Sequence, residues 1–471
     1  MEKKTCIAMV PCPGQGHLIP LVEFAKTLIH QHNNLHLTLL IPTLGPPTPS
    51  IKAILNSLPP NIDFNILPHI SIQDLPQNVH PAIHMKLTVT HSLPFLHEAL
   101  TSLNTRTHLV ALIFDVFSSD ALHLANQFNI LSYVFFTSGA LTLSFCLSFP
   151  KLDETVSSQF IDSTKTVNVP GSIIPFQVKD LVDLVLYERS SEIYKIYLGL
   201  CQKLYFVDGI IVNSFTDMEA EAIRAVQEKT TFVDSPSVYP VGPIIGTGST
   251  SKESQMECIQ WLNNQPPKSV LYICFGSGGT ITHDNLNEIA FGLELSGQKF
   301  LWVLRAPNNS ASSSYLMGQM EDHLSYLPSG FLNRTKEQGL VVPSWAPQIE
   351  ILSHGSTGGF LSHCGWNSTL ESVVHSVPMI AWPLFAEQRM NAIVLTDVLK
   401  VAVRPKVDDQ SSGIVKHEEI ARVIKIIMEE EEGLQIRKRI KDLSDAAAVA
   451  LSEHGSSTRA LSILAHKFQN I

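Results

Sequence analysis

The segment GFLSHCGWNSTLES, residues 359–372, has the pattern of a strand that turns directly into a helix. An apolar run that starts at Gly359 meets His363 and Cys364, and the chain then enters a polar segment with the composition of a helix start. We expect Gly365 to permit the sharp turn between this strand and this helix. Such a junction can hold a metal ion, a nucleophile or a phosphate, and the rest of the chain discriminates between them.

Both halves of the chain repeat this unit of strand, turn and helix. The N-terminal region contains the apolar runs TCIAMVPC and LHLTLLIPT on either side of a helical segment, LIPLVEFAKTLIHQH. Further apolar runs end at residues 115, 138 and 215, and the pattern restarts with SVLYICFGSGG at 269–279. Continuous apolar strands that alternate with helices predict parallel sheets covered on both faces, which is an α/β fold.

The length of 471 residues predicts two domains, because one hydrophobic core rarely grows beyond about 250 to 300 residues. The segment YPVGPIIGTGSTSKES has the composition of an interdomain linker. Doubly wound domains bind ligands outside the carboxyl ends of their strands. We predict an N-terminal domain at 1–238, a linker at 239–256, a C-terminal domain at 257–450 and a final amphipathic helix at 451–471.

Charge and cysteine content exclude several classes of partner. The net charge of −10 and the pI near 6.0 argue against electrostatic binding to nucleic acid or to anionic lipid. The seven cysteines form no C-x-x-C pair, which is typical of reduced thiols in a reducing compartment. The chain shows neither a signal peptide nor an apolar run of about 18 residues that could span a membrane. We expect a cytoplasmic protein that binds neither membranes nor nucleic acid.

Three glycine-containing loops follow predicted strands and could hold phosphate. The first, PGQGHLIP, is similar to a dinucleotide fingerprint, but Ile19 replaces the third glycine and the second strand ends without the ribose-binding acid. This disfavours an NAD(P)-dependent oxidoreductase. The second, FGSGGT, offers backbone N–H groups and the Ser277 hydroxyl to an anion. In the third, the opening stretch, Asn367 and Ser368 begin a helix whose dipole favours phosphate.

The opening stretch lacks the pattern of a metal site. In an extended strand, His363 and Cys364 point to opposite sides, and no second ligand pair follows at helical spacing. No nearby residue supplies a base that would activate Cys364 as a nucleophile, so a phosphate site remains. His17, at the amino end of the first helix, is open to a structural or a catalytic role. Asp115, at a strand end, is open to a capping or a catalytic role.

A longer segment around the opening stretch carries a family resemblance. From Trp345 to Gln388 the chain contains WAPQ, HCGWNS, ES, VP, WP and EQ, at the spacing of the signature box of plant secondary-product glycosyltransferases. It resembles that family, whose members use UDP-sugars. PGQGH, YPVGP and FGSGGT extend the resemblance over the whole chain, most closely to the hydroquinone and monolignol glucosyltransferase branch. Ser376 departs from the pattern, because the family usually has glycine before VP.

The resemblance implies the GT-B fold, in which two Rossmann-like, doubly wound domains face each other across a cleft. The C-terminal domain of such enzymes holds most of the UDP-sugar, and the final helix returns to the N-terminal domain. The amphipathic segment STRALSILAHKFQNI suits that helix. We also expect a monomer that needs neither a metal nor another cofactor, with UDP-glucose as a co-substrate.

The resemblance also assigns the donor site. Trp345 would stack on the uracil, and the backbone of Ala346 would read its edge. Gln388 goes with glucose donors in the family, and its amide would donate to one sugar hydroxyl while accepting from the next. Trp366, in place of an arginine, leaves no cation for a uronic acid. The implied contacts are with the ribose (Gln348, Glu371), the diphosphate (Ser277, His363, Asn367, Ser368) and the sugar (Thr137, Trp366, Glu387, Gln388).

Catalysis and the acceptor site are assigned to the N-terminal half. The family's general base matches His17, and its orienting carboxylate matches Asp115. In-line displacement of UDP would invert the α-donor to a β-glucoside. The acceptor pocket is implied to include His17, Val116 and Phe117, with further walls from 80–90, 140–150 and 180–200.

We therefore expect an inverting O-glucosyltransferase of plant secondary metabolism that transfers glucose from UDP-glucose to a small phenolic, phenylpropanoid or flavonoid acceptor. Two alternatives stay open: a UDP-sugar-binding protein without turnover, and a glycosyltransferase with a terpenoid acceptor or a nitrogen or sulfur nucleophile. The presence of His17, Asp115 and Ser277 argues against the former, since a decayed enzyme usually loses such residues.

Overall fold

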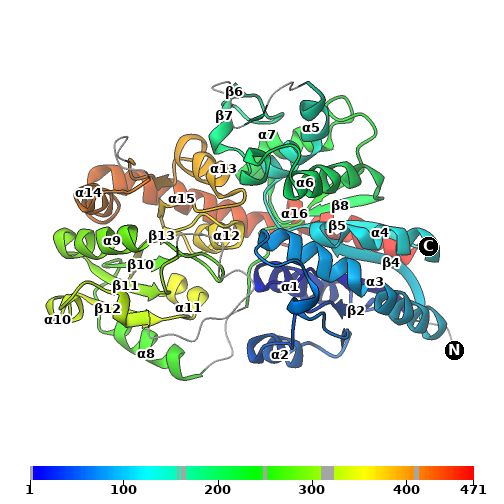
Figure 1. The fold of residues 1–471 in the computed structure, drawn as a ribbon, viewed down its shortest axis with the longest axis horizontal. Coiled ribbons are helices and arrows are strands. Elements are labelled where there is room, and N and C mark those ends of the chain that lie inside the picture. The colour runs from blue at the N-terminus through cyan, green and yellow to red at the C-terminus, as the bar shows by residue number, and fades with distance from the viewer. Residues whose placement is uncertain are drawn as a thin grey trace. The chain divides into compact units, whose positions relative to one another are not determined.

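The computed structural model describes residues 4–155, 159–160, 166–247, 252–308, 323–407 and 413–470. The chain folds into two compact units, of which the first comprises Met1–Gly246 and Ala447–Ile471 and the second Thr247–Ala446. Each unit contains a parallel sheet with helices packed against it (Figure 1). The α/β prediction is therefore confirmed for both halves of the chain.

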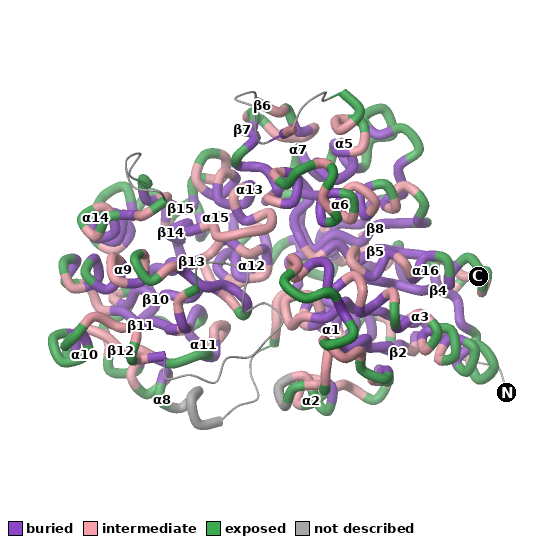
Figure 2. The backbone as a smooth tube through the Cα atoms, in the orientation of Figure 1, coloured by how far each residue is buried: buried purple, intermediate pink, exposed green. Residues whose placement is uncertain are grey.

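The first unit contains a seven-stranded parallel sheet in the order β3-β2-β1-β4-β5-β8-β9. In its central strands β1, β4 and β5, every residue after the first is buried, because both faces of the sheet are covered (Figure 2). The strands are β1 (Thr5–Val10), β2 (His36–Ile41), β3 (Ile62–Ile66), β4 (His108–Asp115), β5 (Leu131–Phe136), β8 (Gly209–Val212) and β9 (Ser237–Pro240), with a separate antiparallel pair, β6 (Thr166–Val167) and β7 (Phe176–Gln177). The α-helices are α1 (Gln15–Gln31), α2 (Pro49–Asn56), α3 (Pro81–Arg106), α4 (Leu122–Phe128), α5 (Ala140–Thr155), α6 (Glu192–Lys203), α7 (Thr216–Gln227) and α16 (Ser456–Gln469). The 3-10 helices are η1 (Ile72–Asp74), η2 (Val116–Ala121), η4 (Val178–Asp180), η5 (Asp183–Leu186) and η6 (Leu204–Phe206).

The final helix, α16, closes the core of the first unit. Leu464 and Phe468 are buried in the same apolar cluster as Phe24 of α1 and Tyr133 of β5. The rings of Tyr133 and Phe468 lie edge to face, with centroids 5.2 Å apart. The expected return of the C-terminal helix to the N-terminal unit is therefore confirmed (Figure 1, red).

Strand β9 corrects the predicted start of the linker. The sequence placed Tyr239 and Pro240 in the linker, but both are buried members of β9 at the edge of the first sheet. An edge strand tolerates proline because one side of its backbone has no neighbouring strand. The first unit then continues to Gly246, and helix α8 begins at Lys252, inside the predicted linker.

The second unit contains a six-stranded parallel sheet in the order β12-β11-β10-β13-β14-β15. Its core joins apolar side chains of the sheet to those of α9 and α14. The strands are β10 (Val270–Cys274), β11 (Lys299–Leu304), β12 (Gly339–Pro343), β13 (Thr357–Ser362), β14 (Met379–Ala381) and β15 (Ala402–Val403). The α-helices are α8 (Lys252–Asn263), α9 (His283–Ser296), α10 (Phe331–Arg334), α11 (Gln348–Ser353), α12 (Trp366–Val374), α13 (Gln388–Ile393), α14 (His417–Met428) and α15 (Glu431–Ala450), which runs on into the first unit. A 3-10 helix, η7 (His323–Tyr326), and a π-helix, η8 (Val394–Val398), complete the described helices of this unit.

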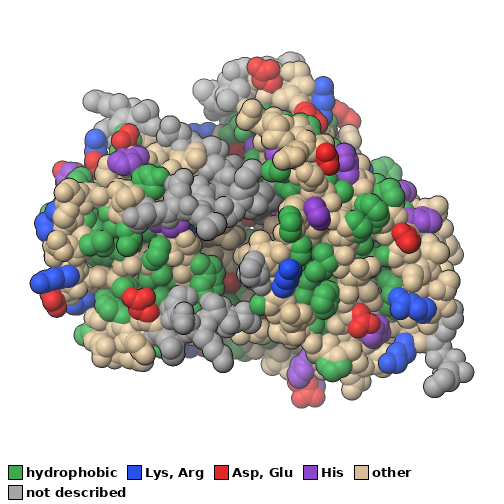
Figure 3. Space-filling model, turned by 60° about the horizontal axis from the view of Figure 1, so that its bottom comes forward, with side chains coloured by type: hydrophobic (Ala, Val, Ile, Leu, Met, Phe, Trp, Pro, Cys, Tyr) green, Lys and Arg blue, Asp and Glu red, His purple; other side chains and the backbone are tan. Residues whose placement is uncertain are grey.

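The surface shows no gathering of positive charge on the face displayed in Figure 3, where Lys and Arg side chains are scattered among acidic, apolar and uncharged ones. Such a distribution agrees with the acidic net charge of the chain. None of the helices in the described ranges combines the length and the apolar character that crossing a bilayer requires.

Candidate functional site

In the first unit, three neighbouring strands end at one edge of the sheet. β1 lies beside β4, and β4 lies beside β5. Because the carboxyl ends of parallel strands meet at one edge, the residues that follow these strands come together. They are His17 in the first turn of α1, Asp115 at the end of β4 and Thr137 directly after β5.

The side chains of His17 and Asp115 are hydrogen-bonded. Nδ1 of His17 lies 2.7 Å from Oδ2 of Asp115 and 3.2 Å from Oγ1 of Thr137. Asp115 is buried, and its other oxygen accepts the backbone N–H of Phe117. The carboxylate therefore orients the imidazole, and Nε2, the nitrogen that does not face Asp115, is the one that can accept a proton from a ligand.

The two predicted acceptor residues lie on η2, directly after Asp115. Val116 and Phe117 are both partly exposed. The Phe117 ring meets the His17 ring edge to face, with centroids 5.6 Å apart. An aromatic ring held beside the imidazole is a suitable apolar wall for an aromatic ligand.

Cys12 lies beside His17 and Asp115, although we predicted from the sequence only that it is a reduced thiol. Its side chain is buried, and one ligand atom each of Cys12, His17 and Asp115 lies within 4.8 Å of the other two. Burial, and then the neighbouring Asp115 carboxylate, raise the pKa of the Cys12 thiol well above its usual value. The sequence shows that Cys12 lies just after the first strand. Only the pairing of β1 with β4 shows that this position is next to Asp115.

In the second unit, the predicted donor residues follow the carboxyl ends of four strands. Ser277 follows β10, Trp345 follows β12, His363 follows β13 and Glu387 follows β14. These parallel strands end at one edge of the second sheet. The structure thus brings the predicted donor residues to one edge of one unit, with the exception of Thr137, which it places beside His17 in the first unit.

The turn after β13 differs from the predicted one. Gly365 has ordinary extended angles, φ −62° and ψ 142°, and the left-handed residue is Cys364, with φ 63°. Gly365 is required for another reason, because a Cβ there would lie 2.4 Å from Nε2 of His363. A Cβ on Gly276, after β10, would lie 2.5 Å from the same nitrogen. The two glycines therefore form a slot that holds the His363 ring.

His363 is suited to bind phosphate as a neutral ligand. Burial lowers the pKa of His363 to about 4, so the ring is uncharged at neutral pH. Its Nδ1 is buried and has no hydrogen-bond partner among the described residues. A buried ring nitrogen of this kind is costly unless a ligand or water satisfies it, which supports the predicted contact with a ligand.

The start of α12 gathers the residues predicted for the ribose and the diphosphate. Nε2 of Gln348 donates to Oγ of Ser368 at 2.9 Å and to Oε2 of Glu371 at 2.6 Å. Burial raises the pKa of Glu371 to about 7, against the opposing effect of the hydrogen bond from Gln348. Asn367, the second residue of α12, is partly exposed. Gln348 and Glu371, the two residues predicted to bind the ribose, are therefore hydrogen-bonded to each other, and Gln348 also donates to Ser368.

Arg305 is a residue that the sequence interpretation missed. Its Nη1 donates to the backbone carbonyl of Ser277 at 2.5 Å, in the second glycine loop. Ser277 itself is exposed. A guanidinium beside this loop is suited to pair with a phosphate. The available signal was the sequence LWVLRA, in which Arg305 directly follows β11, the strand next to β10.

Trp345 and Ala346 follow β12. The exposed fraction of Trp345 is 41%, which is large for a tryptophan, while Ala346 is buried. Ser344, directly before them, has a left-handed φ of 66° and turns the chain at this point. An exposed indole is available to stack on a base, as the resemblance implies.

The geometry of Gln388 corrects one predicted contact. Its Oε1 accepts the backbone N–H groups of Leu384, at 2.8 Å, and of Phe385, at 3.0 Å. The amide oxygen is therefore occupied, and only the NH₂ group remains for a sugar hydroxyl. Among the other predicted sugar residues, Trp366 is buried and Glu387 is partly exposed.

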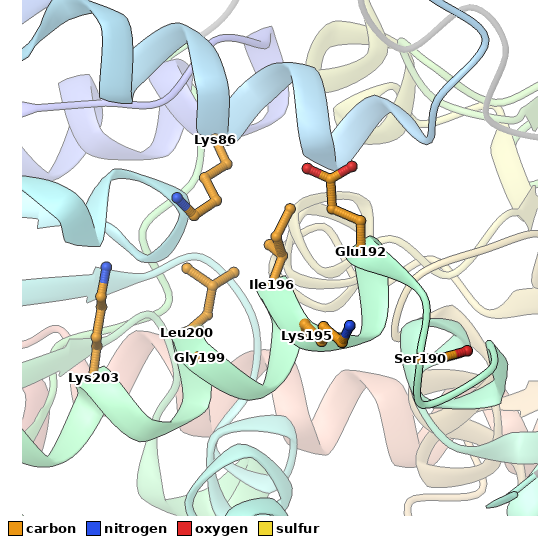
Figure 4. Close-up of a pocket in the computed structure, with 8 residues that line it drawn as sticks. All are labelled: Lys86, Ser190, Glu192, Lys195, Ile196, Gly199, Leu200 and Lys203. Atoms are coloured by element: carbon orange, nitrogen blue, oxygen red, sulfur yellow. The ribbon is translucent and has the colours of Figure 1, made fainter. Parts of the chain in front are cut away.

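A separate cavity of about 390 Å³ lies between α3 and α6 in the first unit (Figure 4). Lys86 and Lys203 line it, and both pair with the carboxylate of Asp120 on η2. Neither His17 nor Asp115 lines this cavity. These ion pairs join Lys86, in the predicted acceptor wall 80–90, and Lys203, at the end of α6, to the helix that carries Phe117.

A protein-family model matches more than half of the chain. Residues 125–431 match the model of a family described as UDP-glucoronosyl and UDP-glucosyl transferase. This chain belongs to that family of UDP-glycosyltransferases. It is therefore a glycosyltransferase enzyme. The matched residues include the whole donor box, whereas His17 and Asp115 lie before them and are covered only by full-length relatives.

Two curated relatives span the whole of this UDP-glycosyltransferase. It is 48% identical to the hydroquinone glucosyltransferase of Rauvolfia serpentina, over 100% of this chain and 99% of the relative. It is 46% identical to UDP-glycosyltransferase 72B1 of Arabidopsis thaliana, over 99% of this chain and 97% of the relative. The resemblance to the plant family is therefore confirmed.

Solved structures of similar proteins confirm the GT-B fold class. The Phytolacca americana UGT2, complexed with UDP-2-fluoro-glucose and pterostilbene, is 45% identical with a TM-score of 0.89, over 99% of this chain and 100% of that one. A UDP-glucosyltransferase from Polygonum tinctorium that glucosylates indoxyl, in complex with 3,4-dichloroaniline, is 44% identical with a TM-score of 0.91, over 100% of both chains.

Proposed function

We propose that this UDP-glycosyltransferase is an inverting O-glucosyltransferase that moves glucose from UDP-glucose to the hydroxyl of a small phenolic acceptor, with His17 as general base. The observation that carries the proposal is the 2.7 Å hydrogen bond between Nδ1 of His17 and Oδ2 of Asp115. A neutral imidazole oriented by a buried carboxylate is an arrangement that general bases use.

In the proposed reaction, Nε2 of His17 takes the phenolic proton while the phenol oxygen attacks the anomeric carbon. A phenol of pKa near 10 is a far weaker acid than an imidazolium of pKa near 6.5, so proton transfer before attack would cost about 5 kcal/mol. Transfer during attack avoids this cost. The bond from the anomeric carbon to UDP breaks, and UDP leaves with the electron pair. Asp115 stabilises the imidazolium, and attack opposite to UDP gives a β-glucoside.

In this proposal, the second unit binds the donor without a metal or another cofactor. The His363 ring and the Ser277 hydroxyl offer neutral donors to the diphosphate, and the amino end of α12 adds its dipole. Arg305 adds a cation beside the loop of Ser277. These groups together replace the charge compensation that a divalent ion would otherwise supply.

The names of the relatives support a phenolic acceptor. The Rauvolfia enzyme is a hydroquinone glucosyltransferase, and the Phytolacca structure contains pterostilbene, which is a phenol. A second candidate is transfer to an aromatic amine, because the Polygonum structure contains 3,4-dichloroaniline. The edge-to-face contact of Phe117 with His17 suits either aromatic acceptor.

The test is to incubate the protein with UDP-glucose and, separately, hydroquinone or 3,4-dichloroaniline, and to follow UDP release and the product. We expect a hydroquinone β-glucoside, identified by the large anomeric proton coupling in its NMR spectrum. An α-glucoside would contradict inversion. Turnover of the aniline alone would favour the second candidate, and failure with both acceptors, despite UDP-glucose binding, would contradict the acceptor class.

A further inference from the structure

We infer that Cys12, His17 and Asp115 together form a binding site for a soft divalent cation of the zinc class, and that an ion bound there stops glucosyl transfer. Thiolate, imidazole and carboxylate are the ligand types that zinc takes in proteins. One ligand atom of each residue lies within 4.8 Å of the other two. Within the described ranges, no other group of three such side chains is brought together in this way.

The distances need little adjustment. Zinc bonds of about 2.0 to 2.3 Å at tetrahedral angles place ligand atoms about 3.3 to 3.6 Å apart. Nδ1 of His17 and Oδ2 of Asp115 are closer than this, at 2.7 Å. An entering ion would therefore separate this pair by about 1 Å and draw in the Cys12 sulfur. Three protein ligands leave a fourth position for water, as in open zinc sites.

Charge balance also favours a divalent ion at this position. The side chains of Cys12 and Asp115 are both 1% exposed, so a thiolate beside the carboxylate would be costly without a cation. On binding, the S–H bond of Cys12 breaks, a sulfur–metal bond forms and one proton passes to solvent. The ion then faces one thiolate and one carboxylate, and the group of ion and ligands carries no net charge.

The inhibitory consequence rests on the proposed role of His17. Since Nδ1 is the nitrogen that faces Asp115, an ion shared with that carboxylate takes Nδ1, and the proton of the neutral ring moves to Nε2. A protonated Nε2 cannot accept the phenolic proton. The residues predicted to bind UDP lie in the second unit, so binding of UDP should persist while transfer stops.

Binding is tested first, with cobalt(II) alone as the probe, because cobalt bound to a thiolate absorbs in the near ultraviolet whether or not the enzyme turns over. We expect a band that saturates at one equivalent in the full chain. Cys12→Ser and His17→Ala should each lose the band or bind at least tenfold more weakly, with native circular dichroism. Cys6→Ser is the matched control, since Cys6 is also buried but its thiol contacts Thr38, and it should keep the band.

A band that survives Cys12→Ser, or no band in the parent, would overturn the site, even if His17→Ala abolishes transfer. Zinc inhibition is then measured for each variant relative to its own rate without zinc. The parent and Cys6→Ser should be inhibited and recover with EDTA, and Cys12→Ser should need at least tenfold more zinc. Cobalt binding with no zinc inhibition would overturn the inhibitory role, and this outcome is distinct from failure of the proposed function.

Discussion

The backbone of Gly276 lies against the ring of His363 so closely that a Cβ on Gly276 would lie 2.5 Å from Nε2. Gly276 follows β10 and His363 follows β13, and the two strands are neighbours in the sheet of the second unit. The glycine loop and the histidine of the predicted diphosphate site therefore act as one structure. Gly365 lies against the same ring, so a side chain at Gly365 should displace His363 and change the affinity for UDP.

The substitution Gly365→Ala should weaken UDP binding by roughly 10- to 100-fold, which corresponds to the loss of one hydrogen bond to a charged group. The new Cβ would lie 2.4 Å from Nε2 of His363, so the ring must leave its position. Isothermal titration with UDP measures the effect. Gly355→Ala is the matched control, because nothing lies within 4 Å of a Cβ there. Equal affinities for both variants would contradict the slot.

Removal of the proposed base should depend on the acidity of the acceptor. His17→Ala should lower kcat/KM for hydroquinone by about 10²- to 10⁴-fold and leave the Kd of UDP nearly unchanged. Asp115→Asn should act in the same direction through lost orientation of the imidazole. The loss should be smaller for 4-nitrophenol, a more acidic phenol that depends less on a base. The same loss for both phenols would argue against proton transfer to His17.

Donor selectivity should depend on the NH₂ group of Gln388. The enzyme should prefer UDP-glucose to UDP-galactose by roughly 10- to 100-fold, because a mispaired buried hydroxyl costs about 1 to 3 kcal/mol. Gln388→Glu keeps an oxygen for the N–H groups of Leu384 and Phe385 but removes the donor, and should reduce this preference. UDP-glucuronate should be poor, since Trp366 offers no cation. The measurement is kcat/KM for each donor with one fixed phenol. Equal values for the three donors would refute the assigned roles of Gln388 and Trp366.

Nucleoside binding should titrate through Glu371. Burial raises the pKa of this carboxyl to about 7, so the protonated form dominates below that pH and the carboxylate above it. In the predicted ribose contact, the carboxylate offers acceptor oxygens to both hydroxyls, whereas protonation turns one oxygen into a donor. The affinity for uridine should therefore rise about fivefold as the pH rises through about 7. Uridine is the probe because it has no phosphate to titrate. Glu371→Gln should bind weakly and without this step, and a flat profile in the parent would contradict the prediction.

Ser376→Gly should stabilise the second unit. Ser376 has a left-handed φ of 58° after α12, with its N–H bonded to the carbonyl of Val373 and the N–H of Val377 bonded to that of Ser372. This is a Schellman motif, which favours glycine at the left-handed position. Relief of about 1 to 2 kcal/mol of strain exceeds the entropic cost of glycine, so we expect a net gain of about 0.5 to 1 kcal/mol in urea unfolding. Ser376→Ala should give no gain, and a less stable Ser376→Gly would show that the serine contributes through another contact.

The sequence by itself was enough for the α/β class, the two halves and the family. Apolar strands alternate with amphipathic helices along the chain, and this periodicity is local. The donor box is also local, since its residues lie between Trp345 and Gln388 and follow strands that the sequence already marks. The residues that the resemblance assigns to the donor within this box lie at one edge of the second sheet, because they follow neighbouring parallel strands.

Contacts between segments that are distant in the chain depend on the tertiary structure. His17 and Asp115 are 98 residues apart, and they meet because β1 pairs directly with β4, although β2 and β3 lie between these two strands in the sequence. The same pairing places Cys12 against Asp115, and the pairing of β10 with β13 sets Gly276 against His363. Strand order and side-chain packing are properties of the whole core, because each depends on which faces must be buried together. The spacing of residues along the chain does not predict strand order or side-chain packing.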